Sequence, residues 1–418
     1  MKKKIIISAY ACSPNTVSEP LVAFNYIETL LKRNEYYIFL LTRKKNCKAI
    51  NDFMINKNYQ GRIKVFGIDL PKILSFWKVG HLSMNLYYTL WQIRAFFVAK
   101  KICSNESILL VHHLSFMSCK INMSPFLEIP SIVGPVGGMQ RTPANFTFFN
   151  YPSIKILFRE FIITCTEASF LWRHFIQKID LLLLANHKNI ESMPPGVNFK
   201  VKQIGWALSK SVTNPIKDNP KKDCIIIYWG GRMEAWKGLG LLLNAINNVK
   251  AYNKSFKLHI TGSGPELRKY QKFTKLHNLE SIVIFHGWVN AEKKRSIQDS
   301  SDIFIFSSLH ETTGTIIFEM MEKSKAIIAF NYAGPSEILH ENCALLIDIE
   351  TPSSIEKITA KLSKSILLLL EDNYLRIKLG KNARNHLIKN HSLEAHVDYM
   401  CSQYKIISEA YKVKNENK

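Results

Sequence analysis

The sequence predicts an α/β fold of two doubly wound domains, each with a parallel sheet between layers of helices. Short apolar segments suited to buried strands alternate with helix-length segments in both halves of the chain. The 418 residues suffice for two domains of ordinary size, and a hydrophobic content of 47% is typical of globular proteins. We therefore expect an N-terminal domain over residues 1–205, a second domain over 206–385 and terminal helices over 386–418. The polar run 209–223 is expected to lie at the connection.

The first strand is expected at residues 4–12, KIIISAYAC. This apolar run is short, and SPNTVSEP follows it in place of a cleavage region, so we interpret it as a strand and not as a signal peptide. No apolar stretch reaches the roughly 18 residues that a membrane span requires. The eight cysteines form no CxxC pair, which favours reduced thiols and a cytoplasmic protein.

Two glutamates surround a predicted strand-loop-helix unit. Residues 302–308, DIFIFSS, suit a buried parallel strand, and Gly314 precedes a helix expected to begin at Thr315. Free amides at that helix N-terminus would suit a phosphate group, with Glu319 one turn further and Glu311 in the loop. Glutamate is mostly solvated in proteins, so their spacing alone favours two surface residues.

A second strand-loop-helix unit carries positive charge. An apolar strand from Ile225 meets adjacent glycines that end with Gly231, and a helix is expected from about Leu239. Arg232 and Lys237 lie in the intervening loop. Glycines allow close backbone approach, and an Arg fork with a Lys point charge is the usual side-chain combination around a diphosphate. If the two strands are neighbours, both loops belong to one site.

Five segments of the C-terminal half occur in the order of the motifs of a known family. The chain resembles retaining glycosyltransferases of the family-four type, the glycosyl transferases group 1, in their bacterial surface-polysaccharide subgroup. The resemblance implies the GT-B architecture, in which two Rossmann-like domains face an interdomain cleft and the last helix crosses back to the first domain. The segments are Gly231-Arg232 with Lys237-Gly238, Gly262–Glu266, Phe285–Val289, Glu311 with Glu319, and Gly334–Ile338.

The N-terminal half matches the same family with two departures. Ser18 and Glu19 match a Gly-Ser-Glu-Pro loop near the acceptor, although Val17 replaces its glycine. Gly137 and Gly138 match a cleft-facing loop, in which Met139 replaces a third small residue.

Two adjacent histidines follow an apolar strand in the same half. His112 and His113 match a position where relatives keep a histidine near the transferred sugar, and we name His113 as the catalytic candidate. A histidine at a strand end is as readily a hydrogen-bonded structural residue.

The resemblance implies transfer of a sugar from a nucleotide-diphosphate sugar to an acceptor hydroxyl with retention of configuration. Arg232 and Lys237 would neutralise the leaving diphosphate, assisted by amides near Gly314 and Thr315. Glu319 would hold the ribose and Glu311 the donor sugar, with Gly231 and Gly264 in the donor loops. No Asp-x-Asp pair occurs in these motifs, so no metal or other cofactor is expected. Same-face substitution and a carboxylate nucleophile both remain compatible with the sequence.

The charge balance predicts an anionic partner. The chain has 56 basic and 33 acidic residues, a net charge of +23. The lysines are scattered and no nucleic-acid recognition module is present, so nucleic acid is not an expected partner. The inner face of a cytoplasmic membrane fits better, with residues 74–102 and 153–179 as aromatic, basic segments suited to its interface. Two amphipathic helices covering a sheet are the simpler interpretation of both segments.

Three classes of function therefore remain. The first is a glycosyltransferase with a glycan or polyprenyl-linked acceptor, as in capsule, O-antigen or exopolysaccharide synthesis. The second is an accessory or binding subunit of the same fold, favoured by the departures at Val17 and Met139. The third is a nucleic-acid-binding protein, which would bind in a strongly salt-dependent manner and ignore sugar nucleotides.

Overall fold

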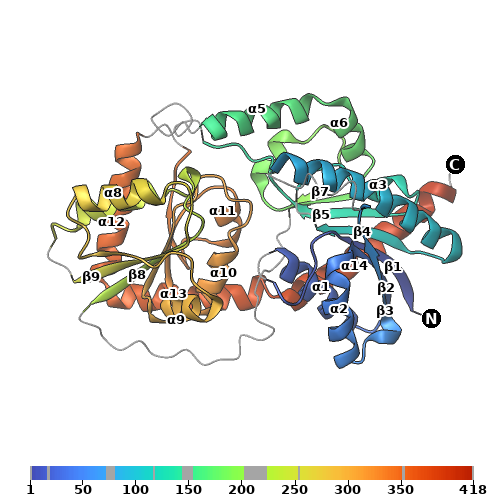
Figure 1. Cartoon of the computed structure of the whole chain (residues 1–418), viewed down its shortest axis with the longest axis horizontal. Coiled ribbons are helices and arrows are strands. Elements are labelled where there is room, and N and C mark those ends of the chain that lie inside the picture. The colour runs from blue at the N-terminus through green and yellow to red at the C-terminus, as the bar shows by residue number, and fades with distance from the viewer. Residues whose placement is uncertain are drawn as a thin grey trace. The chain divides into compact units, whose positions relative to one another are not determined.

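Two parallel sheets organise the chain, one in each of its two units. The computed structural model describes residues 2–16, 19–71, 81–115, 118–143, 154–201, 224–252, 255–350 and 354–416. The first unit comprises residues 1–139, 164–206 and 393–418, and the second comprises residues 140–163 and 207–392. Figure 1 shows each sheet with helices on both of its faces, which confirms the predicted pair of doubly wound sheets.

The sheet of the first unit has seven strands in the order β3-β2-β1-β4-β5-β6-β7, and the neighbours pair in parallel. The expected first strand is β1, an interior strand between β2 and β4, whose Ile5, Ile6 and Ile7 are all buried. The strands are β1 Lys3–Ala9, β2 Tyr36–Arg43, β3 Ile63–Ile68, β4 Leu110–Ser115, β5 Ser131–Val136, β6 Leu181–Leu184 and β7 Phe199–Val201.

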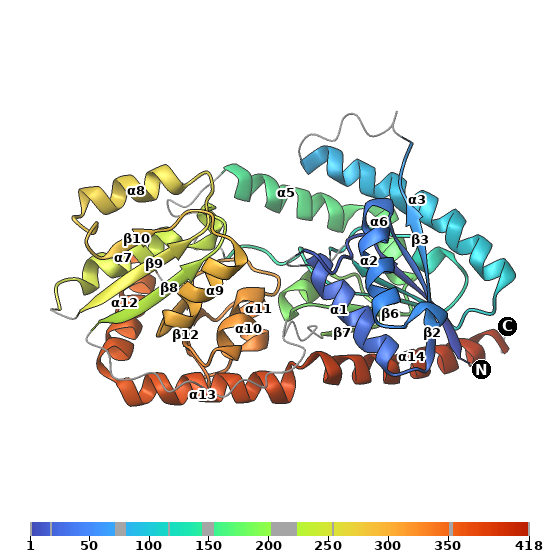
Figure 2. The same cartoon turned by 60° about the horizontal axis from the view of Figure 1, so that its bottom comes forward.

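Helices cover both faces of this sheet. Phe24 of α1 contacts Phe53 of α2 edge-on, and α14 packs beside α1, so these three helices share one face. The other face carries α3, whose Trp91 is fully buried in a core cluster with Ile6 of β1. Figure 2 shows α14 running beside α1. The helices are α1 Glu19–Lys32, α2 Lys44–Asn56, α3 His81–Asn105, α5 Ile154–Ala168, which continues from the second unit, α6 Phe170–Gln177 and α14 Leu393–Glu416.

The C-terminal helix α14 is fixed to the first unit by a buried chain of hydrogen bonds. The Tyr404 hydroxyl lies 2.8 Å from the Tyr26 hydroxyl and 2.7 Å from Nδ1 of His112. Nε2 of His112 lies 2.9 Å from the Gly134 carbonyl, so it carries the proton and Nδ1 accepts from Tyr404. An ion pair between Arg33 and Asp398 at 2.7 Å adds a surface contact.

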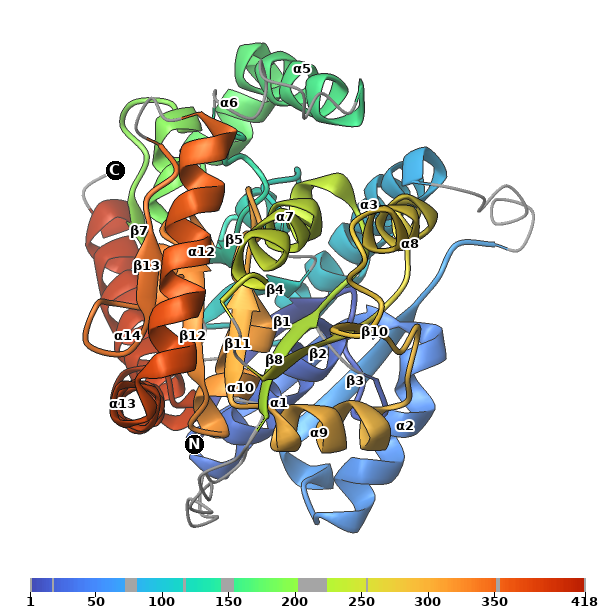
Figure 3. The same cartoon turned by 90° about the vertical axis from the view of Figure 1, so that its left-hand side faces the viewer.

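The second unit has six strands in the order β10-β9-β8-β11-β12-β13. In the core of this unit, the apolar side of α7 packs with α12, and Leu242 and Ile366 are both fully buried. Figure 3 shows α7, α8 and α12 on one face of this sheet and α9, α10 and α13 on the other. The elements are β8 Ile225–Gly230, β9 Phe256–Thr261, β10 Val283–Phe285, β11 Ile303–Phe306, β12 Ala326–Phe330, β13 Leu345–Ile347, α7 Leu239–Val249, α8 Leu267–Leu276, α9 Ala291–Ser300, α10 Thr315–Glu322, α11 Gly334–Ile338, α12 Ile355–Glu371 and α13 Asn373–Asn390.

This strand order places a topological switch point between β8 and β11. The chain leaves β8 toward one edge of the sheet and returns through β11 toward the other, so the loops after these neighbouring strands diverge. Ligands of open α/β sheets bind in the crevice that such loops form at the carboxyl ends of the strands. Lys237 follows β8 and Glu311 follows β11. The expectation that their two strands are neighbours is confirmed.

The two segments suggested for a membrane interface, residues 74–102 and 153–179, each contain both buried and exposed apolar side chains. In α3, which begins within residues 74–102, Tyr87, Tyr88 and Trp91 are buried against the sheet, whereas Leu86, Ile93 and Phe97 are exposed. Residues 72–80 lie outside the described part of the chain. In residues 153–179, Trp172 and Phe175 of α6 are buried, whereas Phe158 of α5 is exposed.

Candidate functional site

The loops that end β8 and β9 pack backbone against backbone. A Cβ atom on Gly262 would lie 1.9 Å from the Gly231 carbonyl oxygen, and one on Gly264 would lie 2.5 Å from the Met233 carbonyl oxygen. The amide of Met233 in turn donates to the Ser263 carbonyl at 2.9 Å. The predicted glycines are therefore required for contact between the loops, which brings the two motifs together.

Lys237 and Glu311 form an ion pair across the switch point. Their side chains are 17% and 20% exposed, so both charges are largely withdrawn from water. The ammonium group also lies 4.3 Å from the centre of the Trp236 ring, which favours a cation electrostatically. The Trp236 ring stacks on His310 with 4.6 Å between ring centres. Trp236 therefore packs against the Lys237 ammonium group, and His310 packs against the Trp236 ring.

The His310 imidazole is kept neutral by its surroundings. Burial, followed by the positive charges of Arg159 and Lys237, lowers the pKa of His310 to about 3. Nδ1 lies 3.2 Å from the Thr142 hydroxyl oxygen. A neutral ring can stack beneath Trp236 without placing a second positive charge beside the Lys237 ammonium.

A segment about 170 residues earlier in the sequence contacts the Glu311 loop. The Gln140 side-chain amide donates to the His310 carbonyl at 3.1 Å and to the Thr312 hydroxyl at 2.9 Å. The Tyr332 hydroxyl donates to the Arg141 carbonyl at 2.6 Å. Residues 140–163 belong to the second unit, so these hydrogen bonds lie within it. The Gln140 amide thus holds the His310 carbonyl and the Thr312 side chain, one on each side of Glu311 in the sequence.

Arg232 is more exposed than Lys237 and has a different partner. Its guanidinium lies 3.2 Å from Glu234, and 63% of the side chain is exposed. An exposed ion pair of this kind is weak, so the guanidinium can reorient toward an incoming anion. Arg232 and Lys237 remain on one loop, as predicted.

The helix α10 begins where the sequence predicts. Gly314 has φ of +88° at the N-cap position, and Thr315 is the first helical residue. The amides of a first helical turn lack partners inside the helix, so this end can bind an anion. The Gly334 amide of α11 donates to the Glu311 carbonyl at 2.9 Å, which joins the last predicted motif to the same loop.

Glu319 lies one turn into α10 and is held by α9. Lys294 pairs with the carboxylate at 2.7 Å, and the Gln298 side-chain amide donates to it at 2.6 Å. The carboxylate is 19% exposed. Glu311 and Glu319 therefore have separate partners, Lys237 for the first and α9 for the second.

The predicted acceptor-side residues lie in the first unit. Glu19 begins α1, and Ser18 lies outside the described residues. Gly137 accepts a hydrogen bond from the Cys119 amide at 3.2 Å, and Gly138 has φ of +94°. Met139 is buried, and its amide donates to the Asn189 side chain at 3.0 Å.

His112 and His113 lie inside β4, Leu110–Ser115, and not after the strand as predicted, because the strand continues through both histidines in parallel pairing with β1 and β5. Both side chains are fully buried in the first unit. Nε2 of His113 lies 3.1 Å from the Tyr88 hydroxyl, and Nδ1 lies 3.1 Å from the Ser8 hydroxyl. Burial lowers the pKa of His112 to about 4, partly offset by its bond to the Gly134 carbonyl. Contact between substrate and His113 would require one of these hydrogen bonds to be released.

The described residues show neither a metal cluster nor a membrane-spanning helix. Among them, no group of three or more His, Cys, Asp or Glu side chains is arranged to hold a metal ion. Nor does the described part of the chain contain a helix that is both long and apolar enough to cross a membrane.

Comparisons with known proteins find a family likeness within the second unit. Residues 212–386 match the family model of the glycosyl transferases group 1. This range of the chain is therefore similar to the glycosyl transferases group 1. Lys237, Glu311 and Glu319 all lie in the matched range, whereas Gln140 and Thr142 lie outside it.

Individual relatives extend this finding to the fold of the chain. An uncharacterized glycosyltransferase of Methanocaldococcus jannaschii is 26% identical over 250 residues, 58% of each chain. The lipopolysaccharide core biosynthesis glycosyltransferase LpsD of Rhizobium meliloti is 27% identical over 39% of this chain and 50% of its own length. The chain thus spans about half the length of these curated relatives. Sucrose-phosphate synthase of Thermosynechococcus elongatus matches the structure with a TM-score of 0.66 and 14% identity, over 98% of this chain and 100% of that one. The fold is therefore GT-B.

Four side chains of the site were not named from the sequence. Trp236 and His310 are the immediate neighbours of Lys237 and Glu311, so adjacency to the predicted residues was the available signal. Gln140 and Thr142 occur in the segment GPVGGMQRTP, of which only the glycines were singled out. Their contact with His310 spans about 170 residues, and no local pattern predicts it.

Proposed function

We propose that the protein is a retaining, metal-independent glycosyltransferase. It moves a sugar from a nucleotide-diphosphate sugar to a hydroxyl group of a glycan or lipid-linked acceptor. The observation that carries the proposal is the Lys237–Glu311 pair at the switch point, inside the range that is similar to the glycosyl transferases group 1. Positive charge, a carboxylate and a helix N-terminus together suit a ligand with both phosphate and hydroxyl groups.

Departure of the diphosphate is the step that needs electrostatic help. As the bond between the anomeric carbon and the phosphate oxygen breaks, negative charge grows on that oxygen. Lys237 is fixed in advance by Glu311 and Trp236, so little reorganisation is needed when the charge develops. Arg232 and the first amides of α10, near Gly314 and Thr315, add further positive potential. These groups perform the work that a divalent ion would otherwise do.

The two glutamates bind different parts of the donor. Glu319, oriented by Lys294 and Gln298 of α9, accepts hydrogen bonds from ribose hydroxyls. Glu311 accepts from hydroxyls of the transferred sugar while it retains Lys237 as its counter-ion. Gly231 and Gly264 keep the loop backbones close enough for the diphosphate to approach.

The reaction proceeds by substitution on one face of the sugar. The acceptor oxygen forms a bond to the anomeric carbon on the side from which the phosphate oxygen departs, and the acceptor proton passes to that phosphate oxygen. No enzyme carboxylate is consumed in this route. A covalent glycosyl-enzyme intermediate on Glu311 is the competing route, because it also retains configuration.

The acceptor binds the first unit in this proposal. Glu19 begins the helix that follows β1, and Gly137 and Gly138 follow β5, so they come after the carboxyl ends of two parallel strands. Ser18, which lies outside the described residues, is proposed to act with them. His113 lies within β4, and it can contact the transferred sugar only if the substrate replaces one of its hydrogen-bond partners, Tyr88 or Ser8. An imidazole in this position would donate a hydrogen bond to the sugar.

The pathway proposed is synthesis of a surface polysaccharide at the inner face of the cytoplasmic membrane. Its support is the likeness to a lipopolysaccharide core glycosyltransferase and the net charge of +23, which suits an anionic surface. A polyprenyl-linked glycan is then the expected acceptor.

Transfer of labelled sugar tests this function. Purified protein is incubated with labelled UDP-, GDP- and ADP-sugars and extracted polyprenyl-linked glycans, in EDTA. We expect label from one donor to enter the lipid fraction, with the anomeric configuration of the donor preserved in the product. Binding of a donor without transfer to any acceptor would instead support the accessory-subunit function.

A further inference from the structure

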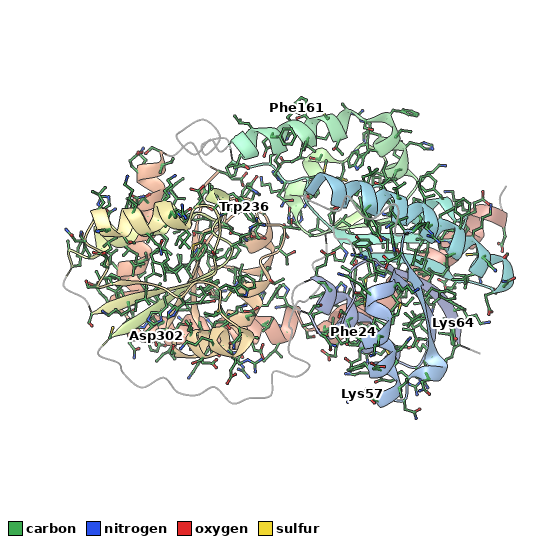
Figure 4. All side chains as sticks on the ribbon, in the orientation of Figure 1. Phe24, Lys57, Lys64, Phe161, Trp236 and Asp302 are labelled. Carbon is green, nitrogen blue, oxygen red and sulfur yellow. The ribbon has the colours of Figure 1, made fainter. Side chains whose placement is uncertain are left out.

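Glu311 lies in a loop without regular structure, so contacts with other segments set its direction. The loop runs from the end of β11 at Phe306 to the start of α10 at Thr315. The Glu311 carboxylate pairs with Lys237, next to Trp236, which Figure 4 labels in the second unit. The backbone gives a loop side chain one direction only where the two peptide planes beside its Cα atom are fixed, because these planes set φ and ψ.

Both peptide planes beside the Glu311 Cα atom are fixed by hydrogen bonds. The His310 carbonyl belongs to the plane that precedes this atom, and it accepts from the Gln140 side-chain amide at 3.1 Å. The Glu311 carbonyl belongs to the plane that follows, and it accepts from the Gly334 amide at 2.9 Å. The Gln140 amide also donates to the Thr312 hydroxyl at 2.9 Å. The direction of the Glu311 side chain therefore depends on Gln140 from one side and on Gly334 from the other.

The supporting side chain is itself anchored. Gln140 is 2% exposed, and its carbonyl accepts from the Arg159 guanidinium at 2.6 Å. The neighbouring Arg141 carbonyl accepts from the Tyr332 hydroxyl at 2.6 Å. Arg159 belongs to α5 and Tyr332 follows β12, and all four residues lie in the second unit. Both protons of the Gln140 amide are therefore presented to the Glu311 loop from a fixed backbone.

The groups proposed to hold the nucleotide do not depend on this support. Glu319 is held by two side chains of α9, and the Arg232 guanidinium lies 3.2 Å from Glu234. Loss of the Gln140 hydrogen bonds should therefore affect Glu311 and leave these other groups in place.

We propose that Gln140 is a positioning residue for sugar transfer. Its amide fixes the peptide plane before Glu311, and the Glu311 carboxylate in turn fixes the Lys237 ammonium group that faces the leaving diphosphate. The inference rests on the proposed function and adds to it a residue outside the range matched by the family model. Gln140 contacts no donor group in that function, and it acts through the direction of Glu311.

Chemical labelling of Lys237 tests this role without any substrate. Gln140→Met keeps the length of the side chain and removes both donors, so the Glu311 loop should loosen. An ammonium group held by a carboxylate must leave it before it reacts. We expect an amine-reactive ester to acylate Lys237 about threefold faster or more in the variant, as peptide mass spectrometry measures. An unchanged rate at Lys237 would overturn the proposal.

Two controls separate a local change from general loosening. Lys323 is 18% exposed and pairs with Asp299, so its labelling rate in the same sample should not change. Gln403 of α14 is 4% exposed and accepts from Lys200 at 3.0 Å in the first unit. Gln403→Met also removes a buried hydrogen bond, yet the rate at Lys237 should keep its wild-type value. A comparable increase at Lys237 in both glutamine variants would contradict a positioning role.

Kinetics should separate positioning from nucleotide binding. In Gln140→Met, kcat for sugar transfer should fall by about 10- to 100-fold, because a small misplacement of a group at the reacting centre is costly. Calorimetry with the free nucleoside diphosphate should show an affinity within about twofold of wild type, since Glu319 and Arg232 keep their partners. Equal losses of kcat and nucleotide affinity would overturn the proposal. If the wild type transfers no sugar while Lys237 labelling responds as expected, the proposed function fails and the positioning of Glu311 stands.

A double-mutant cycle shows whether Gln140 acts through Glu311. Glu311→Gln removes the carboxylate and keeps the shape of the side chain. In that background Gln140→Met should lower the remaining kcat by less than about twofold, because the group that it positions is already absent. Losses that add in the double variant would mean that Gln140 acts by another route, and would contradict the assignment.

Discussion

At the scale of single residues, the central feature is that Lys237 is held by two different interactions. Glu311 supplies the opposite charge, and Trp236 supplies a ring face at 4.3 Å. His310 supports that ring and remains neutral, because burial and neighbouring cations lower its pKa to about 3. The ammonium position is therefore fixed before any ligand binds, which is the property that electrostatic catalysis requires.

Replacement of Lys237 should separate catalysis from stability. Lys237→Ala should lower turnover by roughly 10²–10³-fold, because one preorganised charge at the leaving group is lost. The matched control is Lys323→Ala, whose side chain is 18% exposed and pairs with Asp299 away from the switch point. Steady-state kinetics and thermal unfolding of both variants make the comparison. A similar loss of turnover in the two variants would argue against a catalytic Lys237.

The low pKa of His310 predicts a pH-dependent stability. An unfolded chain takes up a proton on this imidazole near pH 6.5, whereas the folded protein does so only near pH 3. Between these values the unfolded state binds more protons, so the free energy of unfolding falls as pH falls. From pH 6.5 to 5 this group contributes a loss of about 2 kcal/mol. Urea unfolding at both pH values should show a smaller loss in His310→Asn than in wild type; equal losses would refute the assigned pKa.

At the scale of elements, the loop between β8 and α7 depends on one glycine. Gly238 has φ of +69°, and a Cβ atom there would lie 1.9 Å from the Ser307 carbonyl oxygen. That carbonyl belongs to the loop after β11, so Gly238 brings the two loops of the switch point into contact. The positions of Lys237 and Glu311 follow from this close approach.

Replacement of Gly238 or Gly287 by alanine should distinguish the cost of backbone strain from the cost of steric overlap. Gly287 has φ of +65°, but a Cβ atom there would have no described neighbour within 4 Å, so Gly287→Ala should cost about 1 kcal/mol. Gly238→Ala adds the overlap with Ser307 and should cost at least about 2 kcal/mol. Urea unfolding measures both. Equal effects would mean that the loops can separate without cost.

The attachment of α14 should depend on the Tyr404 hydroxyl. Tyr404→Phe removes its bonds to Tyr26 and His112, leaving Nδ1 of His112 buried without its donor. We expect a loss of about 1–3 kcal/mol in the free energy of unfolding of the first unit. Tyr411→Phe on the same helix should change it by less than about 0.5 kcal/mol. Indistinguishable variants would show that apolar packing alone holds α14.

At the scale of the whole molecule, the regular elements were the predictable part. The apolar runs of β8 and β11 and the start of α10 at Thr315 follow from local pattern, and the structure contains them. Pairing between side chains was not predictable. Glu311 could equally have been solvated, and its contact with Lys237 depends on strand order.

Long-range contacts explain the remaining gaps between sequence and structure. Gln140 reaches the His310 loop only because residues 140–163 pack with the second unit. The exposed face of α5 was equally unpredictable, since its sequence is apolar on more than one side. Arg159 and Glu160 decide which side faces inward, through bonds to residues about 20 positions away.

Donor binding in the absence of metal is the most direct test of the account. Thermal unfolding is measured with UDP-, GDP- and ADP-sugars in EDTA, for wild type and for Glu319→Ala. The account predicts a rise in Tm with one nucleotide class in wild type, and a much smaller rise in Glu319→Ala because the ribose contact is lost. A rise that requires added divalent metal, or one that is undiminished in Glu319→Ala, would contradict it.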